Sequence, residues 1–448
     1  MFMKRGIIFS LLIITFLTIK AQTVTKLSLQ EALDYAVKHN YDIMRSEKDV
    51  LAAKQRVNQN MAYGFPQLNA AVNYKDNIAR PVSLIPGDFF GHPGEEVEVQ
   101  FGTRYNMNVG AELSQLIFSS EYLLGLQASK KFFEKTNVDF FKNKVAVQKE
   151  VADWYYNVLV TRKALQIIDS MLITTQKLYD QTKQIVNTGL GEDTDLDQME
   201  LLVENLKISK TKIKNQIKVT KSFLKYYLGI DNNAEVICTD NLKTLIDKKR
   251  NSRLLTYNFN YLQNPDFISL SKSKEISAIQ IKLARSGNYP SLLGKISAAT
   301  NAQRKVWDFF DTGEKWYFSS FWGVTLKIPI ISGGERAAKV KQAKIAFEQI
   351  NIAEKQLATK LQIQYQTLRN DYLNTMMVLE NKEKNRKVAE KIYRKTRVKY
   401  LNGMASSLDI LNTHTQYMNA ENEYVTASLN FLKAAQALET ILVKFKNQ

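Results

Sequence analysis

The sequence predicts a mainly α-helical chain with a transmembrane β portion, in which a unit of two strands and a long helical hairpin occurs twice. Three observations lead to this fold class. Two stretches of more than 60 residues contain neither proline nor glycine. Four segments alternate apolar with polar residues at the period of a β-strand. The chain also resembles itself at an offset of 214 residues.

The first 21 residues indicate export. Residues 1–21 combine Lys4 and Arg5 with an apolar run that ends at Ile19 and a small residue, Ala21. A run of this length is typical of a secretory signal peptide and is short for a membrane-spanning helix. We therefore expect 1–21 to be a signal peptide, with an N-terminal membrane anchor as the alternative. Cys238 is the only cysteine, so the chain has no internal disulfide.

The two stretches without proline and glycine predict very long helices. Proline breaks a helix and glycine weakens it, and both are absent from 126–188 and 335–402. Each helix would be on the order of 100 Å long, so the helices must lie against one another. In the last helix, residues at alternating intervals of three and four positions predict a coiled-coil seam. They are Leu408, Leu411, Thr415, Met418, Asn422, Val425, Leu429 and Leu432.

The internal repeat indicates a duplicated half-molecule. Residues 118–134 align with 332–348, and the same offset pairs Gly189 with Gly403. A period this long is not that of a solenoid. The first repeat is expected at 22–228, with a helix, strands at 64–76 and 100–117, and a helical hairpin at 119–228 that turns near 189. The second is expected at 264–448, with a helix, strands at 289–301 and 315–331, and a hairpin at 332–446 that turns near 403. Residues 229–263 separate the repeats.

The predicted strands favour a membrane barrel. From Phe101 to Leu113 the odd positions are mostly apolar and the even positions are small or polar, and 316–328 follows a similar pattern. Strands of about ten residues with one apolar face suit a transmembrane barrel, although a sheet packed on a soluble core is the alternative. Four strands cannot close a barrel, and an open edge cannot face lipid. Three subunits would give twelve strands and a lumen, whereas two would give a filled eight-stranded barrel.

The order of these segments resembles that of the outer membrane efflux protein family, the TolC-like channels. LSLQEALDYAVKHNYDI at 27–43 is similar to the family's first helix, and GFPQL at 64–68 to its entry into the first strand. NTGL at 187–190 and LNGMASSLDIL at 401–411 are similar to its tip turns. The resemblance implies a homotrimer with a twelve-stranded barrel in outer-membrane lipid and an α-helical tunnel through the periplasm of a Gram-negative cell. It also implies docking on a periplasmic adaptor and an inner-membrane pump of RND or ABC type, with 229–263 as the equatorial belt.

The tip turns carry the candidate site residues. Gly189 and Gly403 follow the long helices, where glycine adopts a left-handed conformation easily. Asp193 and Ser407 stand, within one residue, where the next helices need N-caps. Capping alone could account for this pattern. The resemblance implies instead that the adaptor touches Gly189, Leu190, Gly403 and Met404, and that the tunnel entrance is gated by Asp409, Asn412, Asp195 and Tyr400. Asn412 stands where the family often has Asp, and Ala405 stands where some members have Arg.

The sequence shows no catalytic or cofactor motif. The spacing from Asp193 to Glu204 mimics a calcium loop but has Gln198 where such a loop needs glycine. The three histidines, His39, His92 and His414, are scattered, and no phosphate-binding loop occurs. We therefore expect no enzyme, no metal and no cofactor. The net charge of +18 does not indicate a nucleic-acid partner, because an exported protein rarely meets one.

The predicted function is an outer-membrane exit duct of a tripartite efflux or type I secretion system. A periplasmic adaptor is one alternative, but adaptors have a single helical hairpin and this chain has two. A secreted coiled-coil structural protein is the other, but it would lack the alternating aromatic strands.

Overall fold

The computed structural model describes residues 24–91, 93–189 and 191–445. The predicted signal peptide, His92 and Leu190 lie outside these residues. The chain forms two compact units, and each takes segments from both halves of the sequence. Unit 1 comprises Met1–Arg45, Asn143–Phe259 and Ile363–Val443, and unit 2 comprises Ser46–Lys142, Asn260–Gln362 and Lys444–Gln448.

The order of two strands, a long helix, a turn and a second helix occurs twice, which confirms the predicted fold class. The first half contains β1 (Val24–Leu27), α1 (Leu29–His39), α2 (Tyr41–Ala62), β2 (Gln67–Asp76), β3 (Val82–Pro86), β4 (Glu96–Gln100), β5 (Tyr105–Ser119), α3 (Ser120–Asn187) and α4 (Asp193–Leu228). The second half contains β6 (Glu235–Cys238), α5 (Leu242–Arg250), α6 (Pro265–Ser286), β7 (Ser291–Arg304), β8 (Tyr317–Lys327), α7 (Glu335–Leu401) and α8 (Ser407–Ile441). No helix in the described ranges combines the length and the apolar character that crossing a membrane requires.

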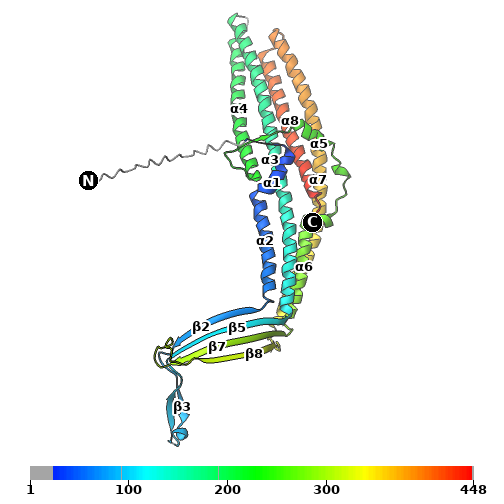
Figure 1. The fold of residues 1–448 in the computed structure, drawn as a ribbon. Coiled ribbons are helices and arrows are strands. Elements are labelled where there is room, and N and C mark those ends of the chain that lie inside the picture. The colour runs from blue at the N-terminus through cyan, green and yellow to red at the C-terminus, as the bar shows by residue number, and fades with distance from the viewer. Residues whose placement is uncertain (1–23, 92, 190, 446–448) are drawn as a thin grey trace, which may run out of the picture. The chain divides into compact units, whose positions relative to one another are not determined.

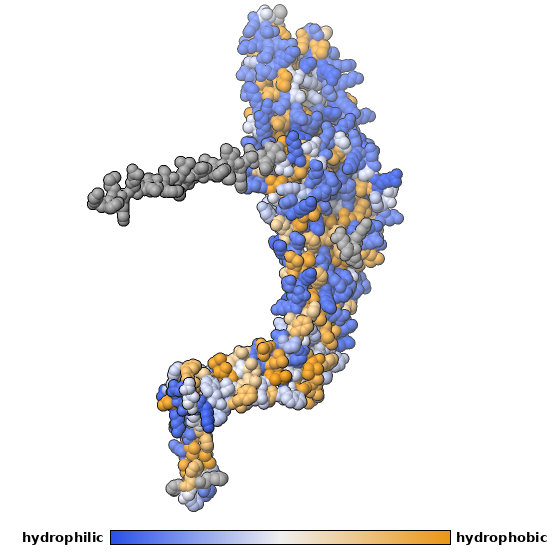
Figure 2. Space-filling view, viewed as in Figure 1, coloured by the Kyte–Doolittle hydropathy of each residue, from blue (hydrophilic) through white to orange (hydrophobic). Residues whose placement is uncertain are grey.

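Unit 2 is built around a four-stranded antiparallel sheet with the strand order β2-β5-β7-β8 (Figure 1). The register places Leu68, Leu113, Ile296 and Trp322 in one row across the sheet. Because side chains alternate along a strand, the other residues of this face follow from the same register. Two rows further along the sheet, this face carries Val72, Val109, Thr300 and Phe318. This face is apolar, and Figure 2 shows hydrophobic side chains over these strands.

The opposite face of the sheet is polar. One of its rows contains Asn73, Asn108, Asn301 and Tyr317. Lys295 and Glu112 form an ion pair on this face, with 2.9 Å between Nζ and Oε2. Strands β2 and β8 form the edges of the sheet, and neither edge pairs with a further strand of the described chain. The sheet therefore has two chemically different faces and two open edges.

Two features of the sheet region differ from the sequence prediction. Strand β5 begins at Tyr105, although the alternating pattern starts at Phe101, because Gly102 has a φ of 86° that interrupts the extended backbone. Between β2 and β5, strands β3 and β4 form a separate antiparallel hairpin. The three prolines of this segment do not prevent the pairing, because Pro81 stands before β3, Pro86 is its last residue and Pro93 lies in the turn.

Unit 1 contains the tip halves of the two helical hairpins, α3–α4 and α7–α8: all of α4 and α8, α3 from Asn143 and α7 from Ile363. These helices run side by side (Figure 1). All four helices share one buried cluster, to which Ile168, Met199, Tyr393 and Ile410 each contribute from a different helix. Burial of these apolar side chains is the main stabilising interaction between the hairpins.

The predicted seam on α8 is wrong at several positions. Leu408 is 57% exposed, and Thr415 and Asn422 are exposed as well. The buried side of α8 includes instead Ser407, Ile410, His414 and Glu421, and it meets the predicted seam at Val425 and Leu432. It also contains polar residues with partners inside the unit, such as His414 and Glu421. The prediction followed the aliphatic residues and therefore missed the buried side in the first half of the helix.

The segment between the repeats is structured and belongs to unit 1 as far as Phe259. Strand β6 pairs with β1 in parallel, and Cys238 at its end is buried, which raises the pKa of its thiol to about 12. Gly229 ends α4 with a φ of 71°, and a Cβ atom at this position would lie 2.1 Å from the carbonyl oxygen of His39. Glycine is therefore required here both for its conformation and for the close approach of α1.

Candidate functional site: the tips of the helical hairpins

The two tip turns share a glycine in the left-handed conformation. Gly403 has a φ of 69°, its N–H donates to the Tyr400 carbonyl at 3.0 Å, and the N–H of Met404 donates to the Lys399 carbonyl at 2.8 Å. This pair of bonds is a Schellman motif, which satisfies carbonyls at the end of α7. Gly189 has a φ of 75° and donates to Val186 at 2.9 Å in the same way. Open space surrounds both glycines.

The helices that follow the two turns begin differently. Ser406 is the N-cap of α8 and forms a capping box with Asp409. Glu192 is the N-cap of α4, but its side chain does not cap a backbone N–H of the helix; its Oε2 accepts the Thr194 hydroxyl at 3.2 Å instead. Each cap lies one residue before the expected position, Ser407 or Asp193. The segment Asp193–Glu204 is helical from its first residue, so the calcium-loop alternative is wrong.

Asp409 and Asn412 lie on the exposed side of α8. The Asp409 carboxylate accepts hydrogen bonds from the backbone N–H and the hydroxyl of Ser406, which hold the pKa of this carboxyl below its usual range. Asn412 is also exposed, one turn further along α8. The charge of Asp409 is thus free to act on solvent ions while the side chain caps the helix.

Tyr400 is buried in the tip, and the half-buried Asp195 lies near it. Tyr400 is 9% exposed, and its hydroxyl is 3.1 Å from Thr182 Oγ1, a contact that joins α7 to α3. Burial raises the pKa of Tyr400, and the nearby Asp195 carboxylate raises it further. No hydrogen bond or ion pair in the described chain links Asp409 or Asn412 to these two residues. The four predicted gate residues therefore form two pairs: Tyr400 is buried beside the half-buried Asp195, and Asp409 and Asn412 are exposed.

A second buried polar contact was not predicted from the sequence. His414 on α8 lies with its Nε2 3.3 Å from Thr175 Oγ1 on α3, and its ring packs edge-on against Tyr393 on α7. Burial lowers the pKa of His414 to about 4, so the imidazole is neutral at physiological pH. The sequence signal was its spacing: His414 follows Ile410 by four residues and precedes Val425 by eleven, which places all three on one helix face.

No cluster of metal-ligating side chains occurs within 24–91, 93–189 and 191–445. Of the four predicted adaptor-contact residues, Gly189, Gly403 and Met404 are described, and the Met404 side chain is 69% exposed. The tips therefore present exposed turns above a buried core, and this arrangement suits a contact surface.

Comparisons with known proteins agree with this architecture. Outer membrane protein TolC of Vibrio cholerae is 21% identical over 253 residues, which cover 54% of this chain and 55% of the relative. The proteases secretion protein PrtF of Dickeya chrysanthemi is 19% identical over 281 residues, which cover 62% and 59%. The chain thus spans less than two thirds of the length of either relative.

Solved structures match over nearly the whole chain. The outer membrane protein VceC of Vibrio cholerae has a TM-score of 0.69 at 13% identity, covering 93% of this chain and 97% of that one. The Campylobacter jejuni CmeC outer membrane channel has a TM-score of 0.70 at 15% identity, covering 92% and 85%. At these identities the likeness shows the fold.

The family match covers both halves of the chain. The model of the outer membrane efflux protein family matches residues 32–229 and 262–443. The unmatched gap falls in the segment between the repeats, which contains β6 and α5. The resemblance noted from the sequence is confirmed, and the chain belongs to the outer membrane efflux protein family.

Proposed function

We propose that this outer-membrane protein is one of three identical subunits of an exit duct, which passes substrates from a periplasmic adaptor and an inner-membrane pump to the exterior. The observation that carries this proposal is the sheet of unit 2, with its apolar face, its polar face and its two open edges. The family and the fold are those of channels, so we assign transport and no catalysis.

The open edges support assembly into a shared barrel. Backbone N–H and C=O groups at a sheet edge cannot remain unpaired in lipid. In the order β2-β5-β7-β8 every neighbouring pair is antiparallel, so β2 and β8 run in opposite directions. Strand β8 of one subunit can therefore pair with β2 of the next and continue the antiparallel pattern. Three subunits close a twelve-stranded barrel, whereas two would give eight strands and a filled interior.

The two faces of the sheet fit lipid and water. The apolar face, with Val72 and Trp322, would contact the membrane, and the polar face, with its asparagines and the Lys295–Glu112 pair, would line the lumen. A polar, water-filled interior is what distinguishes a transport barrel from a small filled one.

The partners of the tips follow from the family. We propose that the turns at Gly189, Leu190, Gly403 and Met404 contact the adaptor, and that Asp409 and Asn412 line the entrance of the tunnel. The exposure of Met404 and Asp409 supports both assignments. For Tyr400 the buried contact with Thr182 favours a role in holding α7 against α3, and the nearby Asp195 places α4 at the same point of the tip. The name of the relative PrtF, a proteases secretion protein, supports polypeptides as the exported substrates. The name of the family supports efflux.

Neighbouring residues on β2 offer a matched test. Val72→Arg would place a charge on the lipid face, where it costs about 2–4 kcal/mol near the middle of the bilayer. Asn73→Arg would place the same charge on the lumen face. We expect detergent-extracted wild type and Asn73→Arg to be trimers that conduct ions in planar bilayers, and Val72→Arg to fail to assemble. A wild-type monomer that is stable without detergent would contradict the proposal.

A further inference from the structure

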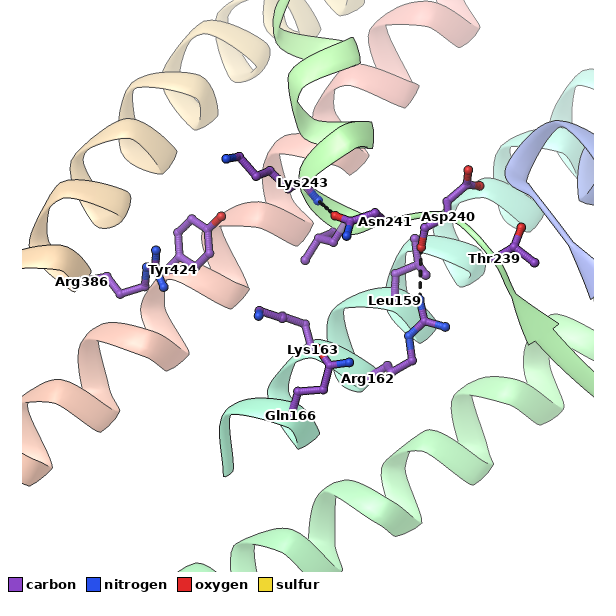
Figure 3. A pocket seen from close by; sticks show the side chains of 11 residues that line it. Leu159, Arg162, Lys163, Gln166, Thr239, Asp240, Asn241, Lys243, Arg386 and Tyr424 are labelled. Carbon is purple, nitrogen blue, oxygen red and sulfur yellow. Dashed lines mark hydrogen bonds between the residues drawn. The ribbon is translucent and has the colours of Figure 1, made fainter. Parts of the chain in front are cut away.

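Unit 1 contains a pocket of about 410 Å³ that the proposed duct does not use. It lies between α3, the residues that lead from β6 into α5, and helices α7 and α8 (Figure 3). Its size is within the range of small-molecule sites in proteins. Only two apolar side chains, Leu159 and Leu242, contribute to its lining.

Four cationic side chains surround this pocket. Arg162 and Lys163 come from α3, Lys243 from α5 and Arg386 from α7. The lining includes one carboxylate, that of Asp240, which is engaged elsewhere. Its Oδ2 accepts hydrogen bonds from the N–H of Leu29 at 2.6 Å and from the Tyr155 hydroxyl at 2.8 Å, at the start of α1. Figure 3 shows this carboxylate pointing away from the pocket.

The two arginines are held in place by groups of the same unit. The Arg162 guanidinium donates to the carbonyls of Cys238 at 2.7 Å and Asp240 at 3.1 Å, and neither acceptor carries a charge. Arg386 donates to Glu421 at 3.3 Å and lies over the Tyr424 ring, 4.8 Å from its centroid. The Nε atom of Arg386 is buried and has no acceptor in the described chain. Both arginines are therefore positioned by the fold. The ion pair with Glu421 compensates the charge of Arg386, whereas the charge of Arg162 is left over.

The two lysines differ from the arginines in having no fixed partner. No hydrogen bond or ion pair in the described part of the chain involves the side-chain nitrogen of Lys163 or Lys243. In Figure 3 the Lys163 side chain extends from α3 toward the side of the pocket where Arg386 and Tyr424 lie. Like charges around one cavity repel each other, and this repulsion is relieved when an anion enters.

We propose that this pocket binds a small polyanion that carries at least two phosphate or carboxylate groups. Preformed arginines supply planar pairs of donors for such groups, and the lysines add charge from other directions. Gln166 and Tyr424 provide neutral hydrogen-bonding groups in the same lining. The site does not depend on the proposed channel function, since all of its residues belong to unit 1.

Calorimetry on the full-length protein in detergent tests the proposal, with pyrophosphate and citrate as probes and sucrose as a neutral control. We expect one binding event per subunit for pyrophosphate, citrate or both, and none for sucrose. The anion that binds more tightly identifies the site as a phosphate or a carboxylate site. Lys163→Gln and Lys243→Gln should each weaken binding about tenfold, which corresponds to about 1.4 kcal/mol. Neither substitution breaks an ion pair of the described chain, so the fold should be unchanged.

Lys177→Gln is the matched control, because Lys177 is an exposed residue of the same helix and does not line the pocket. Equal weakening by Lys177→Gln would mean that the net charge of +18 attracts anions without a site, and would overturn the proposal. Absence of binding by both anions would also overturn it. The proposal would also be overturned if a tetraglutamate peptide bound and neither small anion did, because the pocket would then be assigned to an acidic segment of a protein partner.

Discussion

The Asp409 carboxylate accepts the backbone N–H of Ser406 at 2.9 Å and the Ser406 hydroxyl at 2.8 Å, while Ser406 Oγ accepts the N–H of Asp409 at 3.2 Å. The same carboxylate is exposed to solvent at the start of α8. Capping and ion attraction are therefore two properties of one side chain. Variants that remove one property at a time can separate them.

Ser406→Ala should weaken the cap and leave the charge in place. Loss of the N-cap hydroxyl costs about 1 kcal/mol of helix stability. We expect faster hydrogen exchange of the amides in the first turn of α8 and unchanged block of the channel by multivalent cations. The pKa of Asp409 is lower in the folded than in the unfolded state. The stabilisation that its ionised carboxylate gives to the cap is therefore fully present above the unfolded pKa, and it is lost as the pH falls through the lower, folded pKa.

Asp409→Asn should remove the charge and keep a side chain that can still accept a hydrogen bond. If Asp409 lines the entrance, three copies attract cations, and this variant should weaken multivalent-cation block in planar bilayers. Asn412→Asp should strengthen the block, because it adds a second ring of charge one turn away. Unchanged block in both variants would assign Asp409 to capping alone.

His414 should make the tip sensitive to acid. Its pKa is about 4 in the folded state, against an ordinary value of 6.5 for a solvated histidine. Between pH 6.5 and pH 4, His414 is therefore protonated in the unfolded state but neutral in the folded state. Stability is therefore complete above pH 6.5 and falls as the pH decreases toward 4, by on the order of 3 kcal/mol per subunit. Hydrogen exchange of α3 and α8 between about pH 7.5 and pH 4.5 measures this loss.

His414→Gln should reduce that pH dependence by about one proton per subunit, since glutamine does not titrate but can still bond to Thr175. His39→Gln is the control, because His39 is exposed at the end of α1. An unchanged pH dependence in His414→Gln would show that carboxylates alone govern the acid response.

Two glycines with the same conformation should tolerate alanine very differently. Gly229 and Gly403 have φ values of 71° and 69°. At Gly403 a Cβ meets open space, so Gly403→Ala costs only the left-handed conformation, about 1 kcal/mol. At Gly229 the new Cβ would collide with the His39 carbonyl, and α1 would have to move. Thermal unfolding of the trimer should show a clearly larger decrease for Gly229→Ala; equal decreases would contradict the close approach.

The hairpin β3–β4 should be accessible from outside the cell. It joins β2 to β5 at the sheet ends opposite those that join α2 and α3. Gly91 lies in its turn with open space around it, so an epitope tag inserted there should not disturb the sheet. We expect antibody labelling on intact cells. Labelling only after the outer membrane is broken would reverse the topology.

The sequence predicted the long helices and the strands well, because each depends on one local signal. The absence of proline and glycine defined α3 and α7, and strict alternation defined β5 and β8. Features that depend on distant partners were not predicted. The face of α8 that is buried follows from the partners of His414 and Glu421 on other helices, Thr175 and Arg386. The hairpin β3–β4 was not among the predicted strands.

The candidate site was predicted in part. The positions of both turn glycines and, within one residue, of both caps follow from local backbone chemistry. The different environments of Tyr400 and Asp409 do not follow from local chemistry, because they depend on which helix packs against α7. The family resemblance implied one gate for both residues; in the structure Tyr400 is buried against Thr182 and Asp409 is exposed to solvent.

The open edges of β2 and β8 also have a kinetic consequence. A single chain cannot insert this sheet into lipid, because both edges would leave backbone groups unpaired there. Membrane insertion and subunit association must then be the same event, and the membrane holds no inserted monomer from which the barrel could grow. The rate of insertion should accordingly rise more steeply than the first power of the subunit concentration. Until its partners arrive, each newly exported chain carries two strand edges that are able to pair with the wrong neighbour.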